Sequence, residues 1–328
     1  MSPVSPATPA IEVAGIGRVF GRQAQEVTAL REVTFEVAQG EIVALLGGNG
    51  AGKTTLLKIL STVLTPSWGT ARVQGFDAVE QPRRVREALG VVFGGDRGLY
   101  GRLSARDNLR YFGMLGELGR AQLRRRIPEV LAQVHLEQAA DRRVETFSKG
   151  MRQRLHLAIG LLTRPSVLLL DEPTVGLDPV EAQSLRETVL ALRDEGVAIL
   201  LTSHYLLDVE RLAQRVVLLH EGVVKQQCSL AEFTRQVGHV ATVTVRGTGV
   251  LPDLAARPPQ DLSTLAVRQE GDSWEIDVWP KEWSADVFTE LGRLFGGVAV
   301  RDVRVQDMRL EEAFASQSGP GRAEEAAP

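Results

Sequence analysis

The chain has 328 residues, of which 44% are hydrophobic and 24% charged, enough to bury the core of one large domain and a small one. Its formal net charge of -3 disfavours a nucleic-acid-binding protein, and the single cysteine, Cys228, excludes an internal disulfide framework. No stretch reaches the roughly 18 consecutive apolar residues of a membrane-spanning helix. We expect residues 1–10 to form a disordered tail and not a signal peptide.

Residues 11–235 alternate between strand-like and helix-like segments. Short apolar or alternating runs predict strands at residues 33–37, 41–47, 166–172 and 197–204, and a hairpin at 215–224 that turns at Glu221-Gly222. Residues 54–64 predict a helix with Leu56, Leu57, Leu60 and Val63 on one face. Strands that alternate with helices indicate an α/β domain with a mostly parallel sheet.

Residues 80–162 are mostly helical in pattern and predict a helical lobe inserted into this domain. Ser104 is a suitable N-cap for the helix that follows it, and residues 120–134 form a second amphipathic run. The basic run Arg124-Arg125-Arg126 lies in this run, and we interpret it as a solvated helix face.

The sequence pattern changes at residue 238, and residues 238–316 predict a small α+β accessory domain. A disordered tail is expected at 317–328. The pattern predicts, in chain order, a strand, two strands joined near Gly271-Asp272, a helix, another strand and a short terminal helix. The domain carries no chemical motif, and we expect Trp274, Trp279 and Trp283 to serve in packing.

The segment GGNGAGKT, residues 47–54, fits the phosphate-binding pattern G-x-x-x-x-G-K-S/T between a predicted strand and a predicted helix. Its backbone N–H groups and the helix N-terminus favour phosphate, Lys53 adds a cation, and the Thr54 hydroxyl suits Mg²⁺. The predicted nucleotide-binding residues are Gly47, Gly48, Asn49, Gly50, Ala51, Gly52, Lys53, Thr54 and Thr55.

Two further motifs follow at the ends of predicted elements. In VLLLDEP a buried strand ends in two acids, of which Asp171 would hold magnesium through water and Glu172 would activate the attacking water. In FSKGM, Ser148 and Gly150 lie where an amphipathic helix begins; Ser is a good N-cap and Gly allows close backbone approach.

The order of these motifs over residues 11–235 resembles the nucleotide-binding subunit of an ATP-binding cassette (ABC) transporter. The resemblance implies a P-loop NTPase cassette with a RecA-like core, a helical lobe and an antiparallel β subdomain, and it implies ATP and Mg²⁺ as ligands. It places FSKGM at the signature motif, Asp178 in the D-loop GLDP, and His204 at the switch histidine, a catalytic position beside Glu172 and Lys53.

The chain departs from the family pattern at two motifs. The Q-loop glutamine falls at Gly95 in VVFGGDRGLY, and we hypothesise that Asp96 or a water substitutes for it. The signature has Lys149-Gly150-Met151 in place of Gly-Gly-Gln but keeps Ser148. Phe20 lies near the family's adenine-stacking aromatic, although a core phenylalanine would look the same.

The resemblance also implies partners. Two cassettes would form a head-to-tail homodimer, or a heterodimer with a second ABC subunit, with Ser148 and Gly150 facing ATP in trans. They would drive a separate membrane permease from the cytoplasmic face, and SKGMRQRL, GGDRGLY and the accessory domain resemble the ABC-2-type exporters. The alternatives are a non-transport ABC ATPase and a regulatory module that does not hydrolyse ATP; no nucleic-acid partner is expected.

Overall fold

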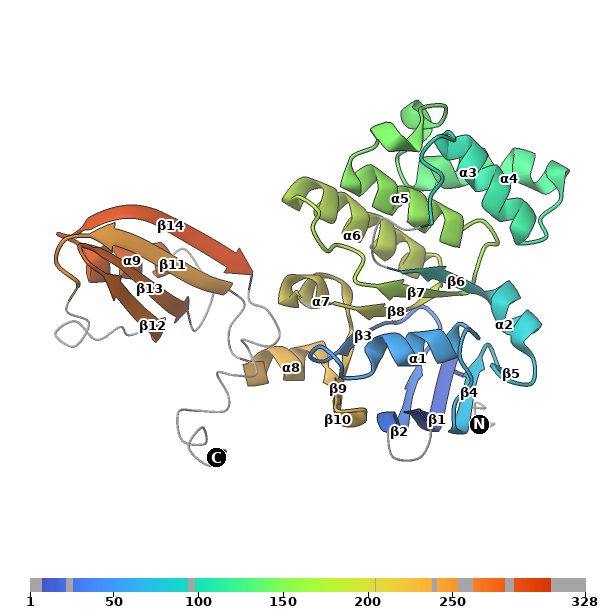
Figure 1. Ribbon diagram of the computed structural model, residues 1–328, viewed down its shortest axis with the longest axis horizontal. Helices are drawn as coiled ribbons and strands as arrows, with labels where there is room; N and C mark the ends of the chain where they lie inside the picture. Colours follow the sequence, from blue (N-terminus) through green and yellow to red (C-terminus); the bar gives the residue numbers. More distant parts are fainter. Residues whose placement is uncertain are drawn as a thin grey trace, which may run out of the picture. The chain divides into compact units, whose positions relative to one another are not determined.

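The structure, a computed structural model, describes residues 8–21, 26–93, 98–203, 205–237, 241–252, 262–280 and 286–307. The chain divides into two compact units (Figure 1). One consists of residues 1–204 and 211–229, and the other of residues 205–210 and 230–328. The domain limits expected from the sequence stay predictions.

The first unit is built on a six-stranded sheet of order β10-β9-β3-β8-β7-β6 (Figure 1). Its strands are β3 (Ile42–Leu46), β6 (Leu89–Val92), β7 (Val167–Asp171), β8 (Ala198–Thr202), β9 (Arg215–His220) and β10 (Val223–Ser229). All pairs are parallel except the hairpin of β9 and β10. The apolar runs predicted as buried strands are buried, and the carboxyl ends of β3, β7 and β8 meet at one edge.

A second, antiparallel sheet has the order β2-β1-β4-β5. It contains β1 (Ile11–Phe20), β2 (Val27–Val37), β4 (Trp68–Val73) and β5 (Phe76–Asp77). Apolar side chains of this sheet, of the six-stranded sheet and of helix α1 (Lys53–Leu60) form one buried cluster. The RecA-like core and antiparallel β subdomain expected from the sequence are confirmed.

Helix α1 is shorter than the sequence predicts. It ends at Leu60, and Thr62 takes a left-handed φ of 64°. Val63, expected on its buried face, is therefore 62% exposed. The error arose because the apolar spacing continues beyond the point where the backbone leaves the helix.

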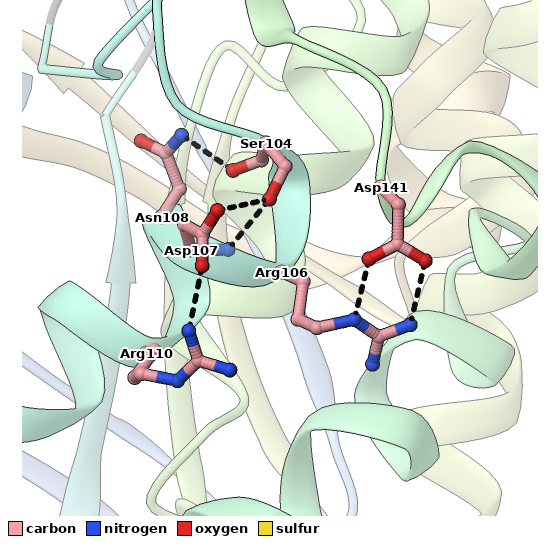
Figure 2. Close-up of polar contacts among 6 residues, drawn as sticks. All are labelled: Ser104, Arg106, Asp107, Asn108, Arg110 and Asp141. Atoms are coloured by element: carbon pink, nitrogen blue, oxygen red, sulfur yellow. Dashed lines mark hydrogen bonds and ion pairs between the residues drawn. The ribbon is translucent and has the colours of Figure 1, made fainter.

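The predicted helical block contains α2 (Pro82–Ala88), α3 (Ala105–Leu115), α4 (Arg120–Gln133) and α5 (Lys149–Gly160). Ser104 caps α3, as expected, by accepting a hydrogen bond from the N–H of Asp107 (Figure 2). The block also contains β6, a strand of the core sheet. A side chain at Gly90 would meet the carbonyl oxygen of Gly160 at 2.5 Å, so glycine lets α5 lie directly on β6.

The remaining α-helices of the described residues are α6 (Pro179–Asp194), α7 (Leu206–Leu212), α8 (Leu230–Val237) and α9 (Asp286–Phe295). The four-stranded antiparallel sheet of the second unit has the order β12-β13-β11-β14. Its strands are β11 (Ala241–Thr248), β12 (Leu262–Glu270), β13 (Ser273–Pro280) and β14 (Ala299–Asp307).

Trp274 serves in packing, as expected, because it is 2% exposed and stacks on Phe295 with ring centroids 5.9 Å apart. The Trp279 side chain, Trp283 and the predicted terminal helix lie outside the described residues. In the part of the chain that the structure describes, no helix combines the length and apolarity needed to cross a bilayer.

Candidate functional site

The phosphate-binding loop connects β3 to α1 and is tightly enclosed. Gly47 has a φ of 154°, and a Cβ there would lie 2.1 Å from the carbonyl oxygen of Leu219. Gly52 has a φ of 107°, and its Cβ would lie 2.6 Å from the carbonyl oxygen of Ala29. Only glycine fits both positions, which explains the pattern of the motif.

The loop forms a pocket of about 180 Å³. Lys53 is buried, and its Nζ donates to the carbonyl oxygens of Gly47 at 2.5 Å and Gly48 at 3.1 Å. The ammonium group is thus held at the loop, while Thr54 is exposed at the start of α1. The pocket is lined by Ala29, Gly48, Asn49, Gly50, Ala51, Gly52, Lys53, Thr54, Thr55 and Glu172.

Glu172 is the acid that the sequence assigned to water activation, and it lines this same pocket. It follows β7 on the sheet edge from which the loop leaves β3. Its backbone adopts a left-handed φ of 50°, which is uncommon for a residue with a side chain. The fold therefore brings together two motifs that lie more than a hundred residues apart.

Thr202, at the end of β8, holds both acids in place. Its Oγ1 donates to Oδ1 of Asp171 at 2.7 Å and accepts from the N–H of Glu172 at 3.0 Å. Its carbonyl oxygen accepts from the same N–H at 3.1 Å. Thr202 is fully buried, so these bonds are shielded from water.

Thr202 is a site residue that the sequence analysis missed. Its contacts cross from β8 to β7, and no local spacing connects Thr202 with Asp171. The sequence feature that could have identified Thr202 is its hydroxyl at the end of a predicted buried strand, because the other motifs were expected at the same edge of the sheet.

Replacing Thr202 by valine should lower the rate of ATP hydrolysis about tenfold or more, because it removes a hydrogen bond to a charged group. The volume changes little, and the chain should stay folded. Phosphate release gives the rate, and urea unfolding gives the stability. Thr188→Val is a matched control, since Thr188 is also buried and its hydroxyl donates to the carbonyl oxygen of Ser184 within α6. Equal rates for the two variants would contradict the role assigned to Thr202.

The signature segment lies at the N-terminus of α5. The Ser148 Oγ accepts from the N–H of Met151 at 3.1 Å and caps the helix. A Cβ at Gly150 would lie 2.6 Å from Cδ of Glu181, so a larger residue at this position would displace the Glu181 side chain. Arg154 and Glu181 are joined by an ion pair of 2.6 Å, which fastens the two helices beside the signature.

Asp178 caps the N-terminus of α6. Its Oδ1 accepts from the N–H groups of Val180 at 3.0 Å and Glu181 at 2.9 Å. This cap fixes the start of the helix that carries Glu181. The predicted role of Asp178 between two subunits stays a prediction.

The other predicted site residues are not among those that form the described lining of the phosphate pocket. Phe20 ends β1, is 36% exposed, and has the Arg18 guanidinium 4.7 Å from its ring centroid. Phe20 is absent from the described lining of the phosphate pocket. His204, Gly95 and Asp96 lie outside the described residues.

The chain matches the family model "ABC transporter" over residues 30–175. It is 41% identical to the ABC transporter ATP-binding protein NatA of Bacillus subtilis, over 65% of this chain and 87% of that protein. It is 34% identical to the daunorubicin resistance ATP-binding protein DrrA3 of Streptomyces coeruleorubidus, over 95% and 97% of the two chains.

Solved structures show the same fold. The ATP-binding subunit of an ABC transporter matches with a TM-score of 0.61 and 34% identity, over 70% of this chain and 94% of that one. A dimeric cassette bound to ADP and phosphate matches with a TM-score of 0.60 at 23% identity, over 67% of this chain and 98% of that one.

Proposed function

This chain belongs to the ABC transporter family of ATP-binding proteins, and from that premise we propose that its ATP is hydrolysed at the pocket shared by the phosphate-binding loop and Glu172. The observation that carries the proposal is that Glu172 lines the pocket with Lys53 and Thr54. A phosphate-binding loop with a carboxylate beside it suits attack by water on the terminal phosphate.

The residues have distinct parts in this step. The loop N–H groups and Lys53 bind the phosphates and offset the charge that develops on them. Glu172 orients a water molecule and accepts its proton, a contribution of roughly 10²- to 10⁴-fold for a general base. His204 would help to hold the same water, and Phe20 would stack on adenine.

Magnesium fits the donor set at this site. Thr54 provides an exposed hydroxyl and Asp171 a half-buried carboxylate, which are hard oxygen donors of the kind Mg²⁺ prefers. Thr202 binds Oδ1 of Asp171, and Oδ2 receives no hydrogen bond from the described residues. When bound, the metal would neutralise charge on the phosphates.

The complete site would form between two chains. The capped N-terminus of α5, with Ser148 and Gly150, is suited to a phosphate because helix N-termini attract anions. Asp178 would lie at the contact between the two chains. ATP would close this head-to-tail dimer, and hydrolysis with product release would reopen it.

The dimer would power a separate permease from the cytoplasmic face of the membrane. Relatives of this chain are named for resistance to daunorubicin and linearmycin, which supports an export role. Two alternatives have less support: a non-transport ATPase does not fit these relatives, and a non-hydrolysing regulator does not fit the position of Glu172.

Mixing two inactive variants tests the head-to-tail dimer. Lys53→Ala disables the phosphate loop and Ser148→Arg blocks the signature, so each variant alone should be inactive. An equal mixture should recover roughly a quarter of the wild-type rate of phosphate release, because half of the dimers are mixed and each has one intact site. As the control, each variant is assayed alone at the total protein concentration of the mixture. No recovery on mixing, with both variants folded by circular dichroism, would contradict the shared site.

A further inference from the structure

Arg18 and Phe20 form a pair at the end of β1. Strand residues two positions apart lie on the same face of a sheet, and the central carbon of the Arg18 guanidinium lies 4.7 Å from the centroid of the Phe20 ring. A guanidinium over an aromatic ring is attracted by the negative face of the ring. Phe20 is still 36% exposed, so the arginine leaves part of the ring accessible to a ligand.

The Arg18 guanidinium is itself held in place. Its Nη1 donates to the carbonyl oxygen of Thr65 at 3.0 Å. Its Nε is buried and makes no hydrogen bond within the described residues. A buried donor without an acceptor costs free energy, and the contact with the Phe20 ring offsets part of that cost. The guanidinium is therefore fixed at one end by Thr65 and covers the ring with its face.

The sheet places the anchor of Arg18 and the phosphate pocket on opposite sides of β1. Strand β1 lies between β2 and β4, and Thr65 precedes β4. On the β2 side, Phe20 pairs with Val27, and Ala29, two residues further along β2, lines the phosphate pocket. Two strand residues span about 7 Å, a length that the ribose of a nucleotide can bridge. A base attached to phosphates in the pocket can therefore reach Phe20 while Arg18 holds the ring from the β4 side.

The backbone beside Phe20 is fastened on the same side. The N–H of Ser67 donates to the carbonyl oxygen of Gly17 at 2.7 Å, and the N–H of Val19 donates to Oγ of Ser67 at 3.1 Å. The register between β1 and β2 shifts between Arg18 and Val19. Such irregularities redirect side chains and are common next to active sites. The end of β1 is therefore held by its backbone and by the Arg18 side chain together.

We infer that Arg18 is a positioning residue for nucleotide binding: it holds the Phe20 ring in the orientation in which the ring stacks on adenine. The inference rests on the proposed function, in which Phe20 stacks on the base of ATP. A ring that is fixed before the base arrives loses less conformational entropy on binding. Arg18 thus raises the affinity for ATP and takes no part in hydrolysis.

Calorimetry with ATP and with inorganic tripolyphosphate tests this role, because only ATP carries a base. In the presence of Mg²⁺, Arg18→Gln should weaken ATP binding roughly three- to tenfold and leave tripolyphosphate binding unchanged. Unchanged tripolyphosphate binding also shows that the variant is folded. Arg18→Lys keeps the cation and should recover part of the lost affinity. In steady-state hydrolysis, Arg18→Gln should raise KM and leave kcat unchanged.

A second background and a matched control separate the ring contact from other effects. Phe20→Ala should weaken ATP binding about tenfold, because it removes the stacking surface. Arg18→Gln should add no further loss in the Phe20→Ala background, because its effect passes through the ring. Arg84→Gln is the matched control: the Arg84 guanidinium lies 5.5 Å from the centroid of the Phe76 ring in β5, and ATP affinity should stay at the wild-type value.

Three outcomes would overturn the inference alone. In Arg18→Gln, these are wild-type ATP affinity beside a weakened Phe20→Ala, an equal loss of ATP and tripolyphosphate affinity, which would show that the charge acts on the phosphates, and a further loss of ATP affinity in the Phe20→Ala background. Wild-type ATP affinity in Phe20→Ala would instead remove Phe20 from the proposed function, and the inference with it. A wild type that binds ATP more tightly than both variants but never hydrolyses it would contradict only the hydrolysis in the proposed function.

Discussion

Replacing Lys53 by alanine is expected to weaken ATP binding by roughly 10- to 100-fold and to abolish measurable hydrolysis, because charged hydrogen bonds to the phosphates are lost. The Lys53 Nζ is held by the carbonyl oxygens of Gly47 and Gly48 at the entrance to α1. A cation fixed there offsets phosphate charge in the ground state and in the transition state. Binding is measured by calorimetry with ATP and hydrolysis by phosphate release.

Lys58→Ala is the matched control for this prediction. Lys58 lies in the last turn of the same helix, away from the phosphate loop, so its replacement should leave ATP affinity unchanged. Wild-type affinity in Lys53→Ala, or an equal loss in both variants, would show that Lys53 does not bind the phosphates.

Glu172→Gln is expected to slow hydrolysis by roughly 10²- to 10⁴-fold while ATP still binds, because the amide keeps the shape of the side chain but cannot accept the proton. The backbone N–H of residue 172 still reaches Thr202 in this variant, so the strained turn is unaffected. Because hydrolysis would reopen the dimer, this variant should accumulate as an ATP-bound dimer. Single-turnover phosphate release and light scattering measure the two effects.

Glu187→Gln is the matched control, since Glu187 is exposed on α6 and accepts a hydrogen bond from Gln183 in the same helix. It should hydrolyse ATP at the wild-type rate. A Glu172→Gln variant that turns over ATP as fast as this control would remove Glu172 from the reaction.

The sequence predicted the parts of this site that depend on local patterns. Strand β7 was predicted because apolar runs bounded by turns are typical of buried strands, and the cap at Ser148 because hydroxyls favour helix N-termini. The glycines at residues 47 and 52 follow from a motif whose spacing is itself a steric requirement. Fold class and ATP binding could therefore be predicted before the structure.

The parts that failed depend on contacts between distant segments. Thr202 acts across two strands, and the backbone N–H that it binds belongs to Glu172, whose φ is left-handed. Strand β6 has only four residues, and its place in the core sheet is fixed by its parallel pairing with β7.

The most direct test of the account is the rate of phosphate release from ATP by the purified wild-type chain, with Mg²⁺ and with the metal removed by EDTA. We expect turnover that requires Mg²⁺ and rises more steeply than linearly with protein concentration, because the proposed complete site needs two chains. Phosphate release that is independent of Mg²⁺ and strictly proportional to protein concentration would contradict it. So would tight ATP binding without hydrolysis at any concentration.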